Sequence, residues 1–449
     1  MRVLVGDEAG FVRTASIEQQ TVTQRWGEAV DRANYVDQVR LLDDVHDPLS
    51  RTAERYAAVA RRVSGVIQLH DTRNGSIVCE WSDEEGHRLP EGTDPSRAHM
   101  NAPAFVGLEI NRHHLLSANE NGRVIFRSLD GVELLDPLPE GIDAESHTRP
   151  YESVGDMEII FDGAGPNLCT MRGLQSDLTT FLTGGRNNDL KLWHLTPSGE
   201  VVSKWAAKNV RPDKFDLHVP IFVRDARFLD ESGHKIATIT GHSQVRVYDT
   251  RVQRRPVQDI TLGELPLTSF DVTPDGSHAF IGNSIGIVTK LDMRKMVPCG
   301  TLKGFAGSVR SIECHRSLPY VACAGLDRFV HVHNTDTRKE VIKVYAMQRS
   351  TSVAFSKERV VAIKKKAGAK AGAKAAVAAD DSDNEEEFLG SDEDEEPEQL
   401  ASAEKAGTST KRTRKPAAEV DEQDEDEEAD DVWKAIPKKL KKTRAAAST

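Results

Sequence analysis

The chain has 449 residues, of which 38% are hydrophobic and 29% are charged, and its formal net charge is −12. Residues 364–449 hold 16 basic and 23 acidic side chains, which leaves a net charge of about −5 for residues 1–363 and argues against a globally basic nucleic-acid binder. The opening residues, "MRVLVGDEAG", lack the apolar run of a signal peptide, and no uncharged apolar stretch approaches the roughly 18 residues of a membrane-spanning helix. We therefore expect an intracellular protein with no membrane partner.

One strand-turn-strand pattern recurs from the start of the chain to about residue 345. In the seven copies, the strand that follows the turn reads "FVRTASIE", "VIQLHDT", "VIFRSLD", "LKLWHLT", "VRVYDTR", "IVTKLDMR" and "VHVHNTD". Seven such units, separated by roughly 42 to 66 residues, are typical of divergent WD repeats that carry insertions. Because one such sheet cannot bury both of its faces alone, the pattern predicts an all-β fold, a seven-bladed WD-repeat β-propeller.

Each end of the repeat region carries an incomplete unit. The chain opens on "MRVLVGD", which has the pattern of a second strand but is not preceded by an inner strand. Residues Ser350–Ile363, "STSVAFSKERVVAI", resemble an inner strand without a blade of its own. We expect the two ends to pair and to close a propeller domain that spans residues 1–363.

The segment "AAKNVRPDKFDLHVPIF", residues 206–222, links the fourth and fifth units. Its alternating pattern predicts that Phe215, Leu217, Val219 and Ile221 face the propeller and that the charged residues remain outside. Loops that present charged residues on a rigid scaffold are often functional, although a loop that merely packs between blades is the alternative. The candidate docking residues are Lys208, Asn209, Arg211, Asp213, Asp216, Arg224 and Asp225, with Arg254 and Arg255 as a second candidate surface.

After Ile363 the composition changes to alternating basic and acidic blocks, which cannot build a core and predict a disordered tail over residues 364–449. Ser382 and Ser391 lie among acidic residues, the context that acidophilic kinases such as casein kinase II favour, and are candidate phosphosites. Two short basic clusters suit capture by a nuclear import receptor, and a merely solvated tail is the alternative. The candidate localisation signal comprises Lys411, Arg412, Arg414, Lys415, Lys438, Lys439, Lys441, Lys442 and Arg444.

Enzymatic motifs are weak or absent in the sequence. "GNSIG" places Ser284 in a G-x-S-x-G pattern, but both flanks are strand-like and no helix follows, so we expect a hairpin turn and not a nucleophile. His331 and His333 share a strand face without further ligands nearby in sequence, and the five scattered cysteines suit reduced core thiols. Asp327 is expected to accept hydrogen bonds within a turn. We predict no catalytic activity, no metal and no cofactor.

Five segments resemble one family, the nucleolar WD-repeat ribosome-biogenesis factors typified by fungal Nop-seven-associated protein one and animal WD-repeat protein seventy-four. They read "TGGRNNDLKLWHL", "AAKNVRPDKFDLHVPIF", "QVRVYDTRVQRRPV", "GELPLTSFDVTPDG" and "LKGFAGSVRSIECHRSLPYVACAGLDRFVHVH". The sequence departs from the family pattern at His194, Pro212 and Phe222.

The resemblance implies a non-enzymatic factor that docks on nucleolar precursors of the large (60S) ribosomal subunit during rRNA processing and maturation. Its implied partners are assembly-factor proteins, pre-rRNA and a AAA-type ATPase that releases it, and it is expected to be a monomer within this larger complex. The alternative is a histone-binding or chromatin-associated WD-repeat scaffold, for which the acidic tail blocks would be the active feature.

Overall fold

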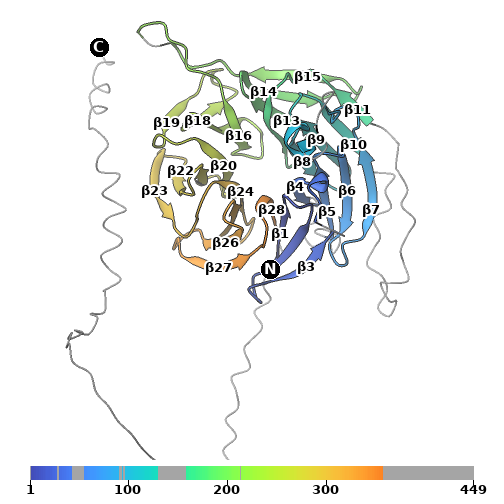
Figure 1. Cartoon of the computed structure of the whole chain (residues 1–449). Helices are drawn as coiled ribbons and strands as arrows, with labels where there is room; N and C mark the ends of the chain where they lie inside the picture. Colours follow the sequence, from blue (N-terminus) through green and yellow to red (C-terminus); the bar gives the residue numbers. More distant parts are fainter. Residues whose placement is uncertain are drawn as a thin grey trace, which may run out of the picture. The chain divides into compact units, whose positions relative to one another are not determined.

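Seven four-stranded antiparallel sheets stand around a common axis in the computed structural model (Figure 1). The structure describes residues 2–27, 30–42, 55–89, 94, 97–129, 158–212 and 214–356. These residues confirm the predicted all-β, seven-bladed propeller. The predicted tail and its candidate signals lie outside the described residues.

Each blade contributes four consecutive strands, except that the first blade takes its inner strand from the other end of the propeller. The first blade consists of β28 (Ser350–Phe355), β1 (Arg2–Asp7), β2 (Val12–Ser16) and β3 (Thr21–Trp26), and the second of β4 (Val36–Leu41), β5 (Tyr56–Arg61), β6 (Val66–Asp71) and β7 (Ile77–Ser82). The third consists of β8 (Phe105–Ile110), β9 (His114–Asn119), β10 (Val124–Ser128) and β11 (Glu158–Phe161). The fourth consists of β12 (Leu168–Leu174), β13 (Asp177–Gly185), β14 (Asn188–Leu195) and β15 (Val201–Ala206).

The remaining three blades follow in chain order. They consist of β16 (Val223–Phe228), β17 (Lys235–Thr240), β18 (Gln244–Asp249) and β19 (Gln258–Thr261); β20 (Leu267–Val272), β21 (His278–Asn283), β22 (Val288–Asp292) and β23 (Val297–Leu302); and β24 (Val309–Cys314), β25 (Tyr320–Gly325), β26 (Phe329–Asn334) and β27 (Glu340–Tyr345). Two short helical segments, η1 (Arg32–Asn34) and α1 (Ala98–Asn101), lie in the connections between blades.

Burial along the strands explains the sequence patterns. The second strand of a blade is sandwiched between neighbouring blades, so β17 reads "KIATIT" and is buried from Ile236 onward. The outermost strand has one face in solvent, and β19 accordingly alternates between half-buried and exposed residues. The recurrent runs found in the sequence are therefore the third strands, which lie between these two environments.

The first blade closes the ring, because β28 pairs antiparallel with β1. Val3 lies opposite Phe355 and Val5 opposite Val353, and the amide of Ser356 donates to the carbonyl of Arg2 at 2.9 Å. This is the pairing that the two incomplete units of the sequence predict.

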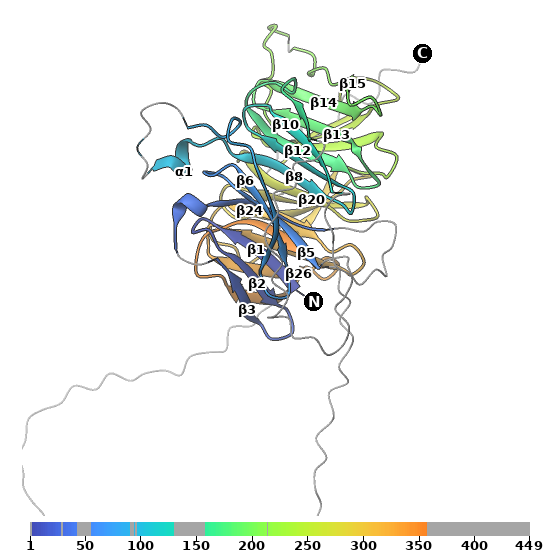
Figure 2. The same ribbon diagram turned by 90° about the vertical axis from the view of Figure 1, so that its right-hand side faces the viewer.

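The inner strands of the seven blades, β28, β4, β8, β12, β16, β20 and β24, are neighbours around the axis. Figure 2 shows the propeller from the side, with the inner strands β12, β8 and β20 labelled from top to bottom through its middle. Residues on these strands therefore meet near the axis even though they lie far apart in the sequence.

The cysteines fit the predicted reduced thiols only in part. All five are free, and Cys79, Cys314 and Cys323 are buried. Burial raises the pKa of Cys79 to about 12, so its thiol is unreactive at neutral pH. Cys299 is exposed on β23, so the expectation that every cysteine belongs to the core is wrong.

Candidate functional site

The connection between β15 and β16, residues 207–222, is the candidate docking segment, and we call it the rim loop. It extends beyond the edge of the ring in both views (light green, Figures 1 and 2). At its start, the amide of Ala207 donates to the carbonyl of Leu190 at 2.8 Å. At its end, the carbonyls of Ile221 and Phe222 accept from Asn187 at 2.9 Å and Gly241 at 3.0 Å. The start is therefore fixed to β14 of the fourth blade, and the end is fixed to the hairpin turns of the fourth and fifth blades.

Asn209 holds the two limbs of the rim loop together. Its Nδ2 donates to the carbonyl of Val219 at 2.6 Å, and its Oδ1 accepts from the amide of Val210 at 2.8 Å. Asn209 itself is half-buried, so these bonds are partly shielded from water. The residue predicted as a docking contact is thus, in the structure, a clamp within the loop.

The tip of the rim loop contradicts the predicted orientation of its apolar residues. Phe215 is 84% exposed and Leu217 is 65% exposed, whereas Val219 and Ile221 are half-buried as predicted. Between the first two, Asp216 has a φ of +60°, a left-handed conformation that interrupts the extended backbone on which strict alternation depends. The prediction that Phe215 and Leu217 face the propeller is therefore wrong.

The two candidate surfaces of the sequence analysis form one surface. Arg254 and Arg255 lie in the turn between β18 and β19. The carbonyl of Arg254 accepts from the amide of Lys208 at 2.8 Å, its Nε donates to the carbonyl of Ala206 at 2.6 Å, and Nε of Arg255 donates to the carbonyl of Asn209 at 3.2 Å. We call the rim loop together with residues 250–257 the rim surface. Lys208, Arg211 and Asp216 are exposed on it, whereas Asp213 lies outside the described residues.

Arg224 and Asp225 do not belong to this surface. Both lie on β16, the inner strand of the fifth blade. Arg224 is half-buried and lies beside Cys169 of β12, whose pKa is raised because the thiol is buried. Asp225 is 8% exposed, so its assignment to an exposed docking loop is wrong. The chain turns from the rim to the axis at Val223, a boundary that the charge pattern alone does not reveal.

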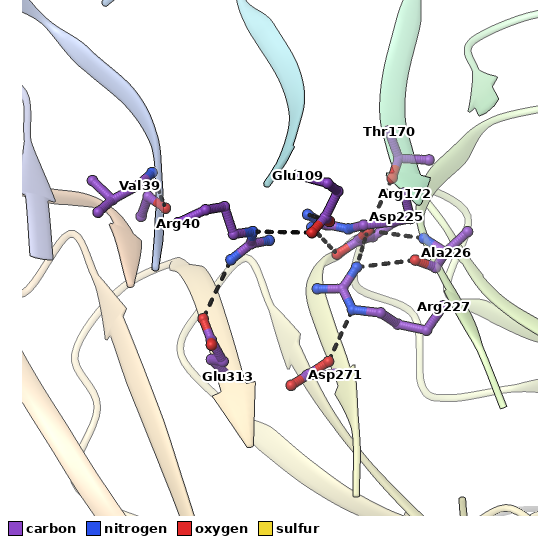
Figure 3. Close-up of polar contacts among 11 residues, drawn as sticks. Val39, Arg40, Glu109, Thr170, Arg172, Asp225, Ala226, Arg227, Asp271 and Glu313 are labelled. Atoms are coloured by element: carbon purple, nitrogen blue, oxygen red, sulfur yellow. Dashed lines mark hydrogen bonds and ion pairs between the residues drawn. The ribbon is translucent and has the colours of Figure 1, made fainter. Parts of the chain in front are cut away.

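Asp225 instead belongs to a set of charged residues around the axis, which we call the central charge network (Figure 3). Apart from Asp225, each member is the fifth residue of its inner strand, which places all of them at one level of the ring. The members are Arg40, Glu109, Arg172, Asp225, Arg227, Asp271 and Glu313.

Basic and acidic groups alternate along this network. Arg40 contacts Glu313 at 3.2 Å and Glu109 at 3.9 Å. Glu109 in turn accepts from Arg172 at 3.4 Å, so one carboxylate bridges two guanidinium groups. The second, third and seventh blades are therefore connected to the fourth through side chains near the axis.

Asp225 and Arg227 continue the network. Asp225 Oδ1 lies 2.7 Å from Arg227 and 3.4 Å from Arg172, and it accepts from the hydroxyl of Thr170 at 3.0 Å. Nε of Arg227 donates to Asp271 at 2.8 Å, and the other oxygen of Asp271 accepts from the amide of Cys314 at 2.7 Å. Four carboxylates and three guanidinium groups thus pair in one continuous network, in which Nε of Arg172 is the one buried side-chain atom without a hydrogen-bond partner among these described residues.

The network shifts the pKa values of its carboxyl groups in opposite directions. Burial tends to raise the pKa of Asp225, but the charges of Arg172 and Arg227 with two hydrogen bonds hold it below its ordinary value. Burial raises the pKa of Glu313, and Arg40 offsets this only in part. The network borders a cavity of about 440 Å³ whose lining also includes Asp230 and Glu231.

The motifs weighed for catalysis or metal binding have structural partners. Ser284 lies in the hairpin turn between β21 and β22, where Asn283 Oδ1 accepts three backbone amides. His331 is buried between Asp327 at 2.7 Å and Glu340 at 2.6 Å. Asp327 also accepts from the amide of Phe329, as predicted for a turn aspartate.

Within the described ranges, no group of three or more His, Cys, Asp and Glu is placed to hold a metal ion. Of the helices in the same ranges, none is long and apolar enough to span a membrane.

The fold and site together define a WD-repeat-type propeller with a fixed axis and one extended rim loop. Comparison with known proteins identifies similar proteins of named families. WD repeat-containing protein 74 of Homo sapiens is 42% identical over 216 residues, which are 47% of this chain and 55% of that protein. Ribosome biogenesis protein nsa1 of Schizosaccharomyces pombe is 24% identical over 386 residues, 82% of this chain and 91% of that protein.

WD repeat-containing protein 74 of Bos taurus is 46% identical over 215 residues, again 47% of this chain and 55% of that protein. The chain thus matches about half the length of these animal relatives. No protein-family model matches the chain. The homologues carry the names of the family that the five sequence segments resemble, so the resemblance is confirmed.

Proposed function

We propose that the chain is a non-enzymatic assembly factor that docks on nucleolar precursors of the large ribosomal subunit. The observation that carries the proposal is the similarity over most of the propeller to a protein named for ribosome biogenesis. The fold supports it, because the chemistry-bearing motifs of the sequence have structural roles while the rim surface presents exposed charge on a rigid scaffold.

Sedimentation of tagged full-length protein tests this function. Co-migration with large-subunit precursors is the expected result. Enrichment with histones in place of precursors would contradict it and favour the chromatin scaffold, in which the acidic blocks of the tail would bind the histones.

The rim surface is the proposed docking site. Reversing three exposed charges together, Lys208→Glu, Arg211→Glu and Asp216→Lys, is expected to reduce recovery of precursor particles and to leave the thermal melt nearly unchanged, because exposed charges contribute little to folding. The matched control reverses two exposed charges in the turn between β22 and β23, Arg294→Glu and Lys295→Glu. Equal particle recovery with the triple variant and the control would exclude docking through these charges.

The tail supplies the proposals on localisation and regulation. We propose nuclear and nucleolar localisation, capture of the basic clusters by an import receptor, and regulation through phosphorylation of Ser382 and Ser391. From the family resemblance we further propose release from the particle by a AAA-type ATPase. Replacing the nine basic residues of the candidate localisation signal with Gln is expected to disperse a fluorescent fusion without changing its thermal melt. Unchanged nucleolar fluorescence would refute the localisation signal.

A further inference from the structure

The rim surface exposes apolar side chains as well as charge. Phe215 and Leu217 at the tip are 84% and 65% exposed, and in the adjoining turn Val252 and Val257 are 68% and 48% exposed. Soluble proteins expose single apolar residues commonly, but apolar residues gathered on one built surface mark interaction sites.

The rim surface also carries exposed basic side chains. Lys208, Arg211, Arg254 and Arg255 are all exposed on the rim surface, and the guanidinium groups of Arg254 and Arg255 are each fixed by a hydrogen bond from Nε to a backbone carbonyl. Asp216 is the opposing charge on the described part of the rim loop. The rim surface therefore combines exposed apolar side chains with a predominantly positive charge among its described residues.

We propose that the rim surface binds a folded protein partner, which receives Phe215 and Leu217 in an apolar pocket and contacts Arg211 and Arg254 with acidic residues at the pocket's margin. This inference rests on the proposed function, because it specifies the partner of the docking site. Buried apolar anchors with a polar, charge-complementary rim are the usual anatomy of a protein interface.

The composition of the surface favours protein over RNA. Phosphate groups would engage the basic residues, and Phe215 offers a ring on which a base can stack. Leu217, Val252 and Val257 have no aromatic face, however, and their exposure to water is relieved by an apolar pocket and not by a phosphate backbone. Three of the four exposed apolar residues thus point to protein.

The rim loop is also ordered for binding. Asn209 joins its limbs through the 2.6 Å bond to Val219, and both ends are fixed by backbone hydrogen bonds to neighbouring blades. A loop held in this way loses less conformational entropy on binding than a free segment does. The left-handed backbone at Asp216 places a turn between the two anchors at the tip.

The test uses large-subunit precursor particles stripped of the endogenous protein by salt, with rebinding of purified full-length protein followed by sedimentation. Phe215→Ser with Leu217→Ser is expected to weaken rebinding at least tenfold. The matched control is Ile285→Ser with Ile287→Ser, which changes two side chains that are 57% and 43% exposed on the sixth blade and is expected to rebind normally. Equal rebinding by both double variants would overturn the proposal.

Two further arms distinguish the partner class. Limited RNase treatment of the stripped particles is expected to leave rebinding of the wild type unchanged, and its loss would overturn the protein assignment in favour of RNA. A photo-crosslinking amino acid at position 217 in intact cells is expected to join one protein through a peptide rich in acidic and apolar residues.

Failure of the wild type itself to rebind would contradict the proposed function rather than this inference. In that case the crosslink decides the inference alone. A crosslink to RNA, or none to a discrete protein, overturns it.

Discussion

The rim loop and the central charge network use the same kinds of residue in opposite ways. On the rim, Lys208 and Arg211 are exposed in the same loop as the exposed Phe215. At the axis, Asp225 is buried and Arg227 is half-buried, and the two pair with each other at 2.7 Å. Only a few residues separate the two regions in the chain, so charge by itself does not distinguish a binding residue from a structural one. What separates them is whether the charge is already satisfied within the fold.

The largest expected effect comes from removing Asp225, a carboxylate of the network that two guanidinium groups share at the axis. Asp225→Ala leaves the guanidinium groups of Arg172 and Arg227 near the axis without the carboxylate that both contact. We expect the free energy of unfolding to fall by about 3 to 5 kcal/mol, measured by urea denaturation. A loss below about 1 kcal/mol would show that the network does not hold the blades together.

A smaller effect is expected from the pH dependence of the stability that Asp225 contributes. Because the folded state holds the pKa of Asp225 below its ordinary value, the stabilisation by its ionised form is complete above about pH 4 and is lost as the pH falls through the folded pKa. The difference in urea midpoint between the wild type and Asp225→Asn should therefore shrink as the pH is lowered from 5 toward 3.

Glu313 does not confuse this comparison, because its raised pKa is present in both proteins and cancels in the difference. A difference that stays constant over the whole interval would contradict the assignment of the lowered pKa to Asp225.

On the rim, the largest effect is expected at the clamp. Asn209→Ala removes the donor to the carbonyl of Val219 and should cost about 1 kcal/mol, mostly through local opening of the loop. Faster tryptic cleavage after Lys214 measures this opening. Lys208→Ala, which leaves the clamp intact, is the control, and equal cleavage rates for the two variants would mean that Asn209 does not hold the limbs together.

The smallest effect on stability is expected at the tip. If Phe215 were buried, Phe215→Ala would cost about 3 to 5 kcal/mol, but at 84% exposure the midpoint of thermal unfolding should correspond to a change within about 0.5 kcal/mol. A large loss of stability in the isolated protein would show that the ring packs against the propeller after all.

The number and order of blades could be predicted because each blade repeats one local pattern, and the closing pair β28 and β1 could be recognised as two incomplete copies of it. The tip of the rim loop could not, since a single left-handed residue, Asp216, changes which side its neighbours face. The assignment of Asp225 to the docking loop was wrong because the charge of a residue does not show where a loop ends and a strand begins.

The central charge network was missed altogether, although a signal for it exists. Apart from Asp225, which shares β16 with Arg227, its members belong to different blades, so no local window of sequence contains two of the aligned inner-strand positions such as Arg40, Glu109 and Arg172. Aligning the seven inner strands on one another reveals a charged residue at the fifth position of six of them, whereas β28 has Ala354 there.

The pairing of β28 with β1 also has a consequence for synthesis on the ribosome. Arg2–Asp7 is synthesised before the other strands of the propeller and Ser350–Phe355 after them, so at about 5 to 20 residues per second β1 waits roughly tens of seconds for its partner. During that interval one edge of the nascent first blade can pair with any other extended chain. Folding of the propeller thus ends with the pairing of its first-made and last-made strands, and until then the growing chain depends on protection of that edge.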